Sequence, residues 1–243
     1  IAFSNPGNDI FHNHELEAGK RLLEHLDGLS DKIFLCKGHW GSQVERDILL
    51  SYENIRIFLI WRDVRDALVS QYFYDINKFG KSYRDFSHFY WWTGRLFLLQ
   101  QISYRHVWTV TQDPRIQNSS FVELKQNFVE AASKLLAFAN IQRVDLEDLD
   151  RRLALDHLRK KHNDPNGAFF RKGMVGEHRE VIHSKKIYDD ISMIEKLDYD
   201  RVRRLIRFEK SRCALHSIKE LPSILRKEGL STFISKLSRF LFR

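Results

Sequence analysis

The chain has little of what marks secreted or membrane-spanning proteins. Among its 243 residues there are only two cysteines, Cys36 and Cys213. Two cysteines are too few for a disulfide framework, so a reducing compartment is the default expectation. No apolar run approaches the length that a membrane-spanning helix needs, and the first residues do not resemble a signal peptide. We therefore expect a cytoplasmic location.

The sequence also lacks the patterns of several enzyme classes. The cysteines show no metal-ligand spacing, and His12-Asn13-His14 has no nearby partners that would complete a zinc set, so we expect no metal. No serine or cysteine lies in a nucleophile-elbow setting, which leaves a hydrolase without support. We find no internal repeat, low-complexity tract or linker. The chain is therefore expected to form a single domain over residues 1–243.

Positive charge is in excess. Forty Lys and Arg against 32 Asp and Glu give a formal net charge of +8. A polyanionic small ligand, nucleic acid or an acidic membrane surface would each fit this charge, and so would a solvated surface without a partner. The last segment, residues 230–243, has the pattern of an amphipathic helix with basic flanks. Its docking on its own domain or on a second copy is favoured over membrane contact, which stays open.

The stretch from Ile55 to Ser70 is the most informative part of the sequence. Its apolar run through Trp61 is typical of a fully buried strand of a parallel sheet. Arg62 follows, then Asp63 as a helix N-cap, then a helical pattern that we expect to reach Phe79 near Gly80. A helix that begins directly after a strand points its free N–H groups at whatever lies beyond the strand. The stretch therefore predicts an anion site, with phosphate as the leading ligand.

Strands and helices alternate along much of the chain. This alternation predicts an α/β fold with a parallel sheet covered on both faces by helices. The expected strands are 32–36, 55–61, 106–110 and 119–122. The expected helices, besides the one after Asp63, are 15–29, 83–101, 124–139, 146–161, 189–197 and 199–221.

Besides Arg62, two further groups of basic residues are candidate site residues. Lys37 and His39 follow the first predicted strand, and Arg171-Lys172-Gly173 follows the break at 162–167. Ligands gather at the carboxyl ends of strands in open α/β sheets, so Lys37, His39 and Arg62 are expected at one edge. His39 could serve as a general base and Lys37 could stabilise growing negative charge. Taken alone, this spacing favours a structural or surface histidine, and the Arg-Lys pair is a weak phosphate signal.

The order of these motifs along the chain resembles that of the PAPS-dependent sulfotransferases of the cytosolic and bacterial small-molecule type. The resemblance spans about residues 32–182, with a helical extension over 183–243. Its specific parts are the spacing from Arg62 to Ser70 and the loop at 170–177. The matching segments are Lys37-Gly38-His39, Arg62-Asp63-Val64-Arg65-Asp66-Ala67-Leu68-Val69-Ser70, Phe121-Val122-Glu123-Leu124-Lys125 and Phe170-Arg171-Lys172-Gly173-Met174-Val175-Gly176-Glu177.

The resemblance implies a three-layer fold like that of the P-loop nucleotide kinases, with a central parallel sheet. It implies that PAPS is the sulfuryl donor, PAP the product, and a hydroxyl or amine of a small molecule or glycan the acceptor. His39 would take the acceptor proton and Lys37 would stabilise the transferring group. The residues implied in binding the nucleotide are Arg62, Ser70, Phe121, Arg171, Lys172 and Gly173.

The chain departs from the family pattern at several positions. We find no Pro-Lys-Ser-Gly-Thr-Thr-Trp-like loop for the 5′-phosphosulfate upstream of Lys37. Gly38 replaces a hydroxyl residue, Trp61 a small residue, and Phe121 a tyrosine that often bonds on the adenine side. A small-molecule kinase and a non-catalytic basic module for nucleic acid or lipid therefore remain alternatives, although nucleic acid is not the expected partner.

An aromatic cluster is the candidate acceptor wall. Tyr90, Trp91 and Trp92 lie in the predicted helix 83–101, and aromatic residues of this density are more often core than ligand wall. A homo-oligomer is compatible with the sequence.

Overall fold

The described strands form two parallel pairs. The structure, a computed structural model, describes residues 2–3, 37–38, 41–109, 112–142, 144–161 and 174–213. Strand β3 (Ile57–Trp61) pairs in parallel with β4 (Ile116–Ser120), with Ile57 opposite Ile116 and Trp61 opposite Ser120. Strands β1 (Ala2–Phe3) and β2 (Lys37–Gly38) form a second parallel pair. The α/β class with parallel strands is confirmed.

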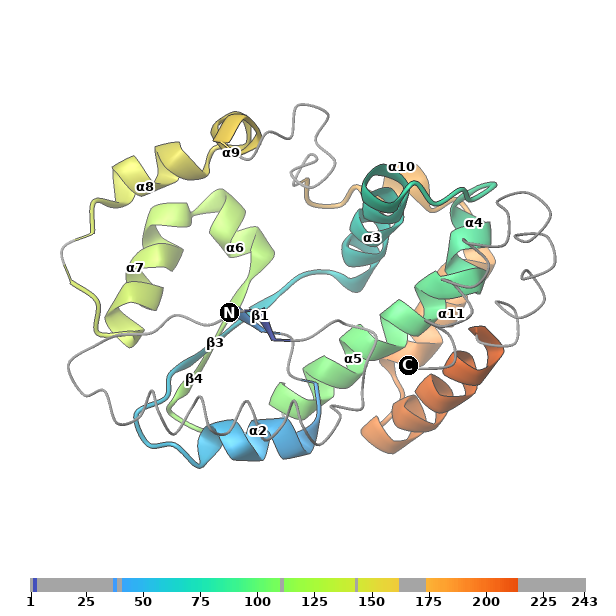
Figure 1. Cartoon of the computed structure of the whole chain (residues 1–243), viewed down its shortest axis with the longest axis horizontal. Helices are drawn as coiled ribbons and strands as arrows, with labels where there is room; N and C mark the ends of the chain where they lie inside the picture. The colour runs from blue at the N-terminus through green and yellow to red at the C-terminus, as the bar shows by residue number, and fades with distance from the viewer. Residues whose placement is uncertain are drawn as a thin grey trace, which may run out of the picture.

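Helices account for most of the described chain. Figure 1 shows α3, α5, α10 and α11 on one side of the β3–β4 pair and α6 to α9 on the other, which gives a layered arrangement. The helix that ends the described chain covers 199–213. The labelled helices are α2 (Gln43–Leu50), α3 (Val64–Phe79), α4 (Phe86–Phe89), the π-helix η1 (Tyr90–Gly94), α5 (Arg95–Thr109), α6 (Phe121–Gln126), α7 (Phe128–Phe138), α8 (Leu146–Leu153), α9 (Leu155–Lys161), α10 (His178–Val181) and α11 (Lys185–Glu195).

Strand β3 is confirmed, but its burial differs from the expectation. Leu59 and Trp61 pack with Ile57 in a core cluster that includes Val107 and Trp108 of α5. Successive side chains of a strand point to opposite faces. Ile60, on the other face, is 53% exposed. The apolar run is therefore not buried on both faces in the part of the chain that the structure describes.

Helix α3 begins and ends where the sequence predicts. The Asp63 side chain accepts a hydrogen bond from the Arg65 backbone N–H at 2.8 Å, as an N-cap does. The helix ends at Gly80, whose φ of 61° lies in the left-handed region that favours glycine. Local signals suffice here because both helix ends are stabilised by residues that are neighbours in the chain.

The predicted strand 106–110 is wrong, because α5 continues as a helix to Thr109. Val107 and Trp108 have side chains that favour strands. On α5 they are 1% and 3% exposed and pack against β3, so tertiary burial outweighs this preference.

Several other predicted boundaries shift, among them those of the helices expected over 83–101 and 189–197. The strand expected over 119–122 ends at Ser120, since Phe121 already begins α6, and the helix expected over 124–139 is interrupted at Asn127. The helix expected over 146–161 is interrupted at Ala154. The predicted elements at 15–29, 32–36 and 230–243 lie outside the described residues. No helix that the structure describes is long and apolar enough to cross a membrane.

The larger core joins α3, the α4–η1–α5 region, α11 and the last described helix. A polar chain runs through this region. Asp190 of α11 accepts hydrogen bonds from the Tyr90 hydroxyl at 2.6 Å and from Arg95 Nε at 2.7 Å. Arg95 also pairs with Glu209, whose side chain is 3% exposed. Buried charges need such partners, so these contacts specify how the helices pack.

Candidate anion-binding site

The candidate site is built where β3 and β4 end. Because the strands are parallel and Trp61 lies opposite Ser120, the residues that follow them, Arg62 and Phe121, come to the same edge of the sheet. The Arg62 guanidinium carbon lies 4.7 Å from the centre of the Phe121 ring. This distance is that of a cation–π contact, which orients the charged group.

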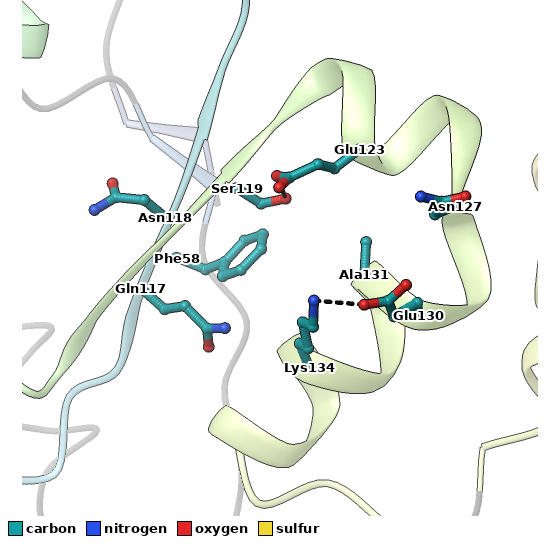
Figure 2. Close-up of a pocket in the computed structure, with 9 residues that line it drawn as sticks. All are labelled: Phe58, Gln117, Asn118, Ser119, Glu123, Asn127, Glu130, Ala131 and Lys134. Carbon is teal, nitrogen blue, oxygen red and sulfur yellow. Dashed lines mark hydrogen bonds and ion pairs between the residues drawn. The ribbon is translucent and has the colours of Figure 1, made fainter.

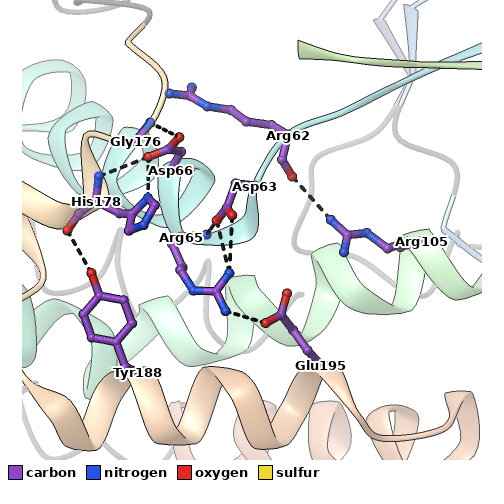
Figure 3. Close-up of polar contacts among 9 residues, drawn as sticks. All are labelled: Arg62, Asp63, Arg65, Asp66, Arg105, Gly176, His178, Tyr188 and Glu195. Carbon is purple, nitrogen blue, oxygen red and sulfur yellow. Dashed lines mark hydrogen bonds and ion pairs between the residues drawn. The ribbon is translucent and has the colours of Figure 1, made fainter. Parts of the chain in front are cut away.

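A third segment reaches Arg62 from much later in the chain. Arg62 Nη2 donates a hydrogen bond to the Met174 carbonyl oxygen at 3.1 Å. Figure 3 shows the Arg62 side chain extending from the end of β3 toward the Gly176 backbone. The structure therefore brings together Arg62, Phe121 and Met174, the residue that directly follows the predicted loop Arg171-Lys172-Gly173.

The Arg62 backbone is held as well. Arg105 of α5 donates to the Arg62 carbonyl oxygen at 3.4 Å. Arg65, in the first turn of α3, pairs with Asp63 at 3.3 Å and with Glu195 of α11 at 2.7 Å. These contacts fix the turn between β3 and α3, whose N-terminus carries the positive end of the helix dipole. The turn therefore offers a cation and the positive end of a helix dipole to an anion.

Asp66 is the residue that sequence reasoning left out of the site. Its Oδ2 accepts from the Gly176 N–H at 2.7 Å, and its Oδ1 accepts from the His178 N–H at 3.0 Å and contacts His178 Nδ1 at 2.9 Å. Burial raises the pKa of the Asp66 carboxyl, but these hydrogen bonds outweigh burial and hold the pKa below its ordinary value. The ionised carboxylate can only accept, so His178 carries its proton on Nδ1.

Gly176 and His178 follow the predicted loop in a defined conformation. Gly176 has φ of 82°, a left-handed value at which other residues are strained. The His178 carbonyl oxygen accepts from the Tyr188 hydroxyl of α11 at 3.4 Å, which Figure 3 also shows. The only sequence signal for Asp66 was its place inside the motif that begins at Arg62, and an acid in a first helical turn is usually explained by the helix dipole alone.

A comparison with known protein families identifies the family of the chain. Residues 45–199 match the family described as the sulfotransferase domain, which is more than half of the chain. The chain belongs to the sulfotransferase family. The match begins in α2 and ends at Tyr199, so it starts after the expected resemblance begins and continues past Ile182 through α11.

Among solved structures, this chain is similar to mouse sulfotransferase SULT7A1 complexed with PAP. The TM-score is 0.49 and the identity 19%, over 67% of this chain and 65% of the mouse chain. The chain thus spans less than two thirds of the mouse protein. No curated protein sequence matches significantly. Family membership and the parallel strands together confirm the P-loop-like α/β class.

Several predicted site residues lie outside the described residues. They are His39, Arg171, Lys172 and Gly173. Lys37 is placed in β2, paired with Ala2. Ser70 lies on α3, two turns after its start, and is half-buried. Among the described residues, no group of His, Cys, Asp or Glu is arranged to hold a metal ion.

The three residues of the predicted acceptor wall have different surroundings. Tyr90 is fully buried and its hydroxyl donates to Asp190, so it has no surface for an acceptor, and its assignment to the wall is corrected. Burial, aided by the Asp190 carboxylate, raises the pKa of Tyr90, so the hydroxyl keeps its proton. Trp91 and Trp92 are half-buried, and Lys186 Nζ lies 5.2 Å from the Trp91 ring centre.

A small cavity opens on the other face of the β3–β4 pair. It has a volume of about 170 Å³ and lies between the strands, α6 and α7 (Figure 2). Its only lining cation, Lys134, pairs with Glu130 at 2.7 Å. The cavity is therefore not a second anion site. Its other lining residues are Phe58, Gln117, Asn118, Ser119, Glu123, Asn127 and Ala131.

Proposed function

We propose that this protein is a PAPS-dependent sulfotransferase that transfers a sulfuryl group to a hydroxyl or amine of a small molecule or glycan. The observation that supports it best is the meeting of Arg62 with Phe121 and the Met174 carbonyl. Arg62, Phe121 and Met174 belong to three of the four sequence segments that match the family pattern, and these contacts bring the three residues together at one edge of the sheet. Family membership favours the same chemistry.

The residues at this edge fit the 3′-phosphate of a nucleotide. Arg62 supplies a guanidinium, which can bond two phosphate oxygens at once, and the α3 N-terminus supplies a positive dipole. In the proposal, Ser70 adds a hydroxyl and Arg171-Lys172-Gly173 closes the site from the other side. No metal is required, because fixed cations can neutralise the charge of the donor.

In the proposed reaction, the acceptor oxygen or nitrogen forms a bond to sulfur while the bond from sulfur to the phosphate oxygen breaks. The proton of the acceptor passes to His39, and PAP leaves with the electron pair of the broken bond. Lys37 stabilises negative charge on the transferring group. In-line transfers of this kind depend on alignment and on electrostatic stabilisation.

Calorimetric titration of the full-length protein with PAP tests the proposal. We expect binding that Arg62→Ala and Arg171→Ala each weaken by about tenfold or more, since a lost charge-assisted hydrogen bond is worth about 1.5–3 kcal/mol. Absence of PAP binding by the wild type, or unchanged binding in both variants, would refute it.

His39→Ala separates catalysis from binding. It should abolish sulfuryl transfer and leave PAP affinity unchanged, because a general base acts on the acceptor and not on the nucleotide. Turnover that survives this substitution would remove the role of His39.

The acceptor wall remains a proposal for Trp91 and Trp92. Replacing either by Ala should raise the KM for the acceptor while the KM for PAPS stays unchanged. An unchanged acceptor KM in both variants would count against an acceptor wall at these residues.

A further inference from the structure

A buried carboxylate of α3 holds the segment that follows the predicted phosphate loop. The Asp66 side chain is 3% exposed and accepts hydrogen bonds from two backbone N–H groups, at Gly176 and His178, and from the His178 ring. Gly176 lies before α10 and His178 is its first residue, and both backbone donors are satisfied by this side chain and not by a backbone carbonyl. The position of the segment therefore depends on Asp66.

The same segment is attached to Arg62. The Met174 carbonyl accepts from Arg62 at 3.1 Å, and Asp66 binds Gly176 two residues later. Both anchors come from one strand–turn–helix unit, since Arg62 follows β3 and Asp66 lies in the first turn of α3. Consecutive Cα atoms are 3.8 Å apart, so fixing residues 174–178 restricts where Gly173 can lie.

We propose that Asp66 is a positioning residue for the Arg171-Lys172-Gly173 loop and thereby sets the affinity for the 3′-phosphate of the nucleotide. This inference rests on the proposed function. Asp66 does not touch the phosphate itself, because a carboxylate would repel it. It acts through Gly176 and His178, whose backbone N–H groups it binds.

Asp75 provides a matched control on the same helix. Its side chain is 4% exposed, compared with 3% for Asp66, and it also accepts three hydrogen bonds. These come from Gln71 at 2.9 Å, Lys81 at 2.8 Å and Tyr83 at 2.7 Å. Asp75 lies in the last turns of α3, at the opposite end from Arg62. A purely structural role would make the two aspartates equivalent.

The experiment compares Asp66→Asn with Asp75→Asn in the full-length protein. Both variants should lose stability, which urea unfolding measures. PAP affinity, measured by calorimetry under conditions where each variant is folded, should fall by roughly tenfold in Asp66→Asn and change less than about twofold in Asp75→Asn. Equal loss in the two variants, or unchanged affinity in Asp66→Asn, would overturn the positioning role.

A second readout does not depend on the nucleotide. Amide hydrogen exchange over residues 174–181 should accelerate in Asp66→Asn and stay at the wild-type rate in Asp75→Asn, since the Gly176 and His178 N–H groups bind Asp66 and not Asp75. If the wild type does not bind PAP, the proposed function fails, and exchange alone decides whether Asp66 positions the segment. Unchanged exchange in Asp66→Asn would overturn that role.

His178→Ala is the milder variant if Asp66→Asn does not fold. It removes the ring contact to Asp66 and leaves both backbone donors in place. PAP affinity should then fall by a few-fold, less than in Asp66→Asn, because one of three hydrogen bonds is lost. Wild-type affinity in a folded His178→Ala protein, together with wild-type exchange over 174–181, would contradict the inference.

Discussion

The Arg62 guanidinium lies 4.7 Å from the centre of the Phe121 ring, although the two residues belong to different strand–helix units. The Phe121 ring supports the cation that we propose as a phosphate ligand. The contact links the ends of β3 and β4, because Arg62 directly follows β3 and Phe121 directly follows β4.

This contact predicts a graded effect of substitutions at Phe121. Phe121→Leu should weaken PAP binding by a few-fold, because a partly exposed cation–π contact is worth about 0.5–1 kcal/mol. Phe121→Tyr keeps the ring and should bind PAP at least as well as the wild type. Calorimetric titration measures both, and equal affinity of the Leu variant and the wild type would contradict an orienting role of the ring.

A side chain at Gly176 should destabilise the protein. At φ of 82° an alanine is strained, and Gly176→Ala should lower the free energy of unfolding by about 1–2 kcal/mol. No atom outside the chain neighbours lies within 4 Å of the added Cβ, so the loss would come from the backbone. Urea unfolding measures it.

Gly80 is the control for Gly176. It has φ of 61° at the end of α3, so Gly80→Ala should lose a similar amount of stability. Of the two variants, only Gly176→Ala should also weaken PAP binding, because Gly176 donates to Asp66 and Gly80 does not. Wild-type PAP affinity in Gly176→Ala would contradict a contribution of Gly176 to nucleotide binding.

The stability contributed by Asp66 should depend on pH. Its pKa is lowered in the folded protein, so the unfolded chain takes up the proton at a higher pH. The contribution is present in full above the unfolded pKa, about 4, and is lost as the pH falls through the folded pKa. The difference in unfolding free energy between wild type and Asp66→Asn should therefore shrink between about pH 6 and about pH 3. A difference that stays constant over this range would contradict ionised Asp66 as the acceptor.

Arg95 should be among the most sensitive positions of the core. Its side chain is 13% exposed and pairs with Asp190 and Glu209. Arg95→Met leaves Asp190 without its cation and leaves Glu209 with Arg212 alone, and breaking a buried pair costs roughly 3–5 kcal/mol. Urea unfolding checks this. Lys134→Met, which breaks the exposed pair with Glu130, should leave the unfolding midpoint unchanged.

Some of the mistaken predictions have a common cause. The segment 106–110 carries residues that favour strands, yet Val107 and Trp108 lie on a helix because there they fill the core beneath β3. Tyr90 looked like part of a ligand wall and is buried beside Asp190. In both cases the outcome depends on segments that are distant in the chain, which composition and periodicity do not report.

The sequence by itself determined the family, the strand that ends at Trp61, the Asp63 cap and the end of α3 at Gly80. These features depend on residue order and on neighbours a few positions apart, which a single sequence displays. Only the tertiary structure decided that Asp66 binds Gly176, a residue 110 positions later. A buried carboxylate needs hydrogen-bond donors, and the packing of segments that are distant in the chain determines which donors lie beside it.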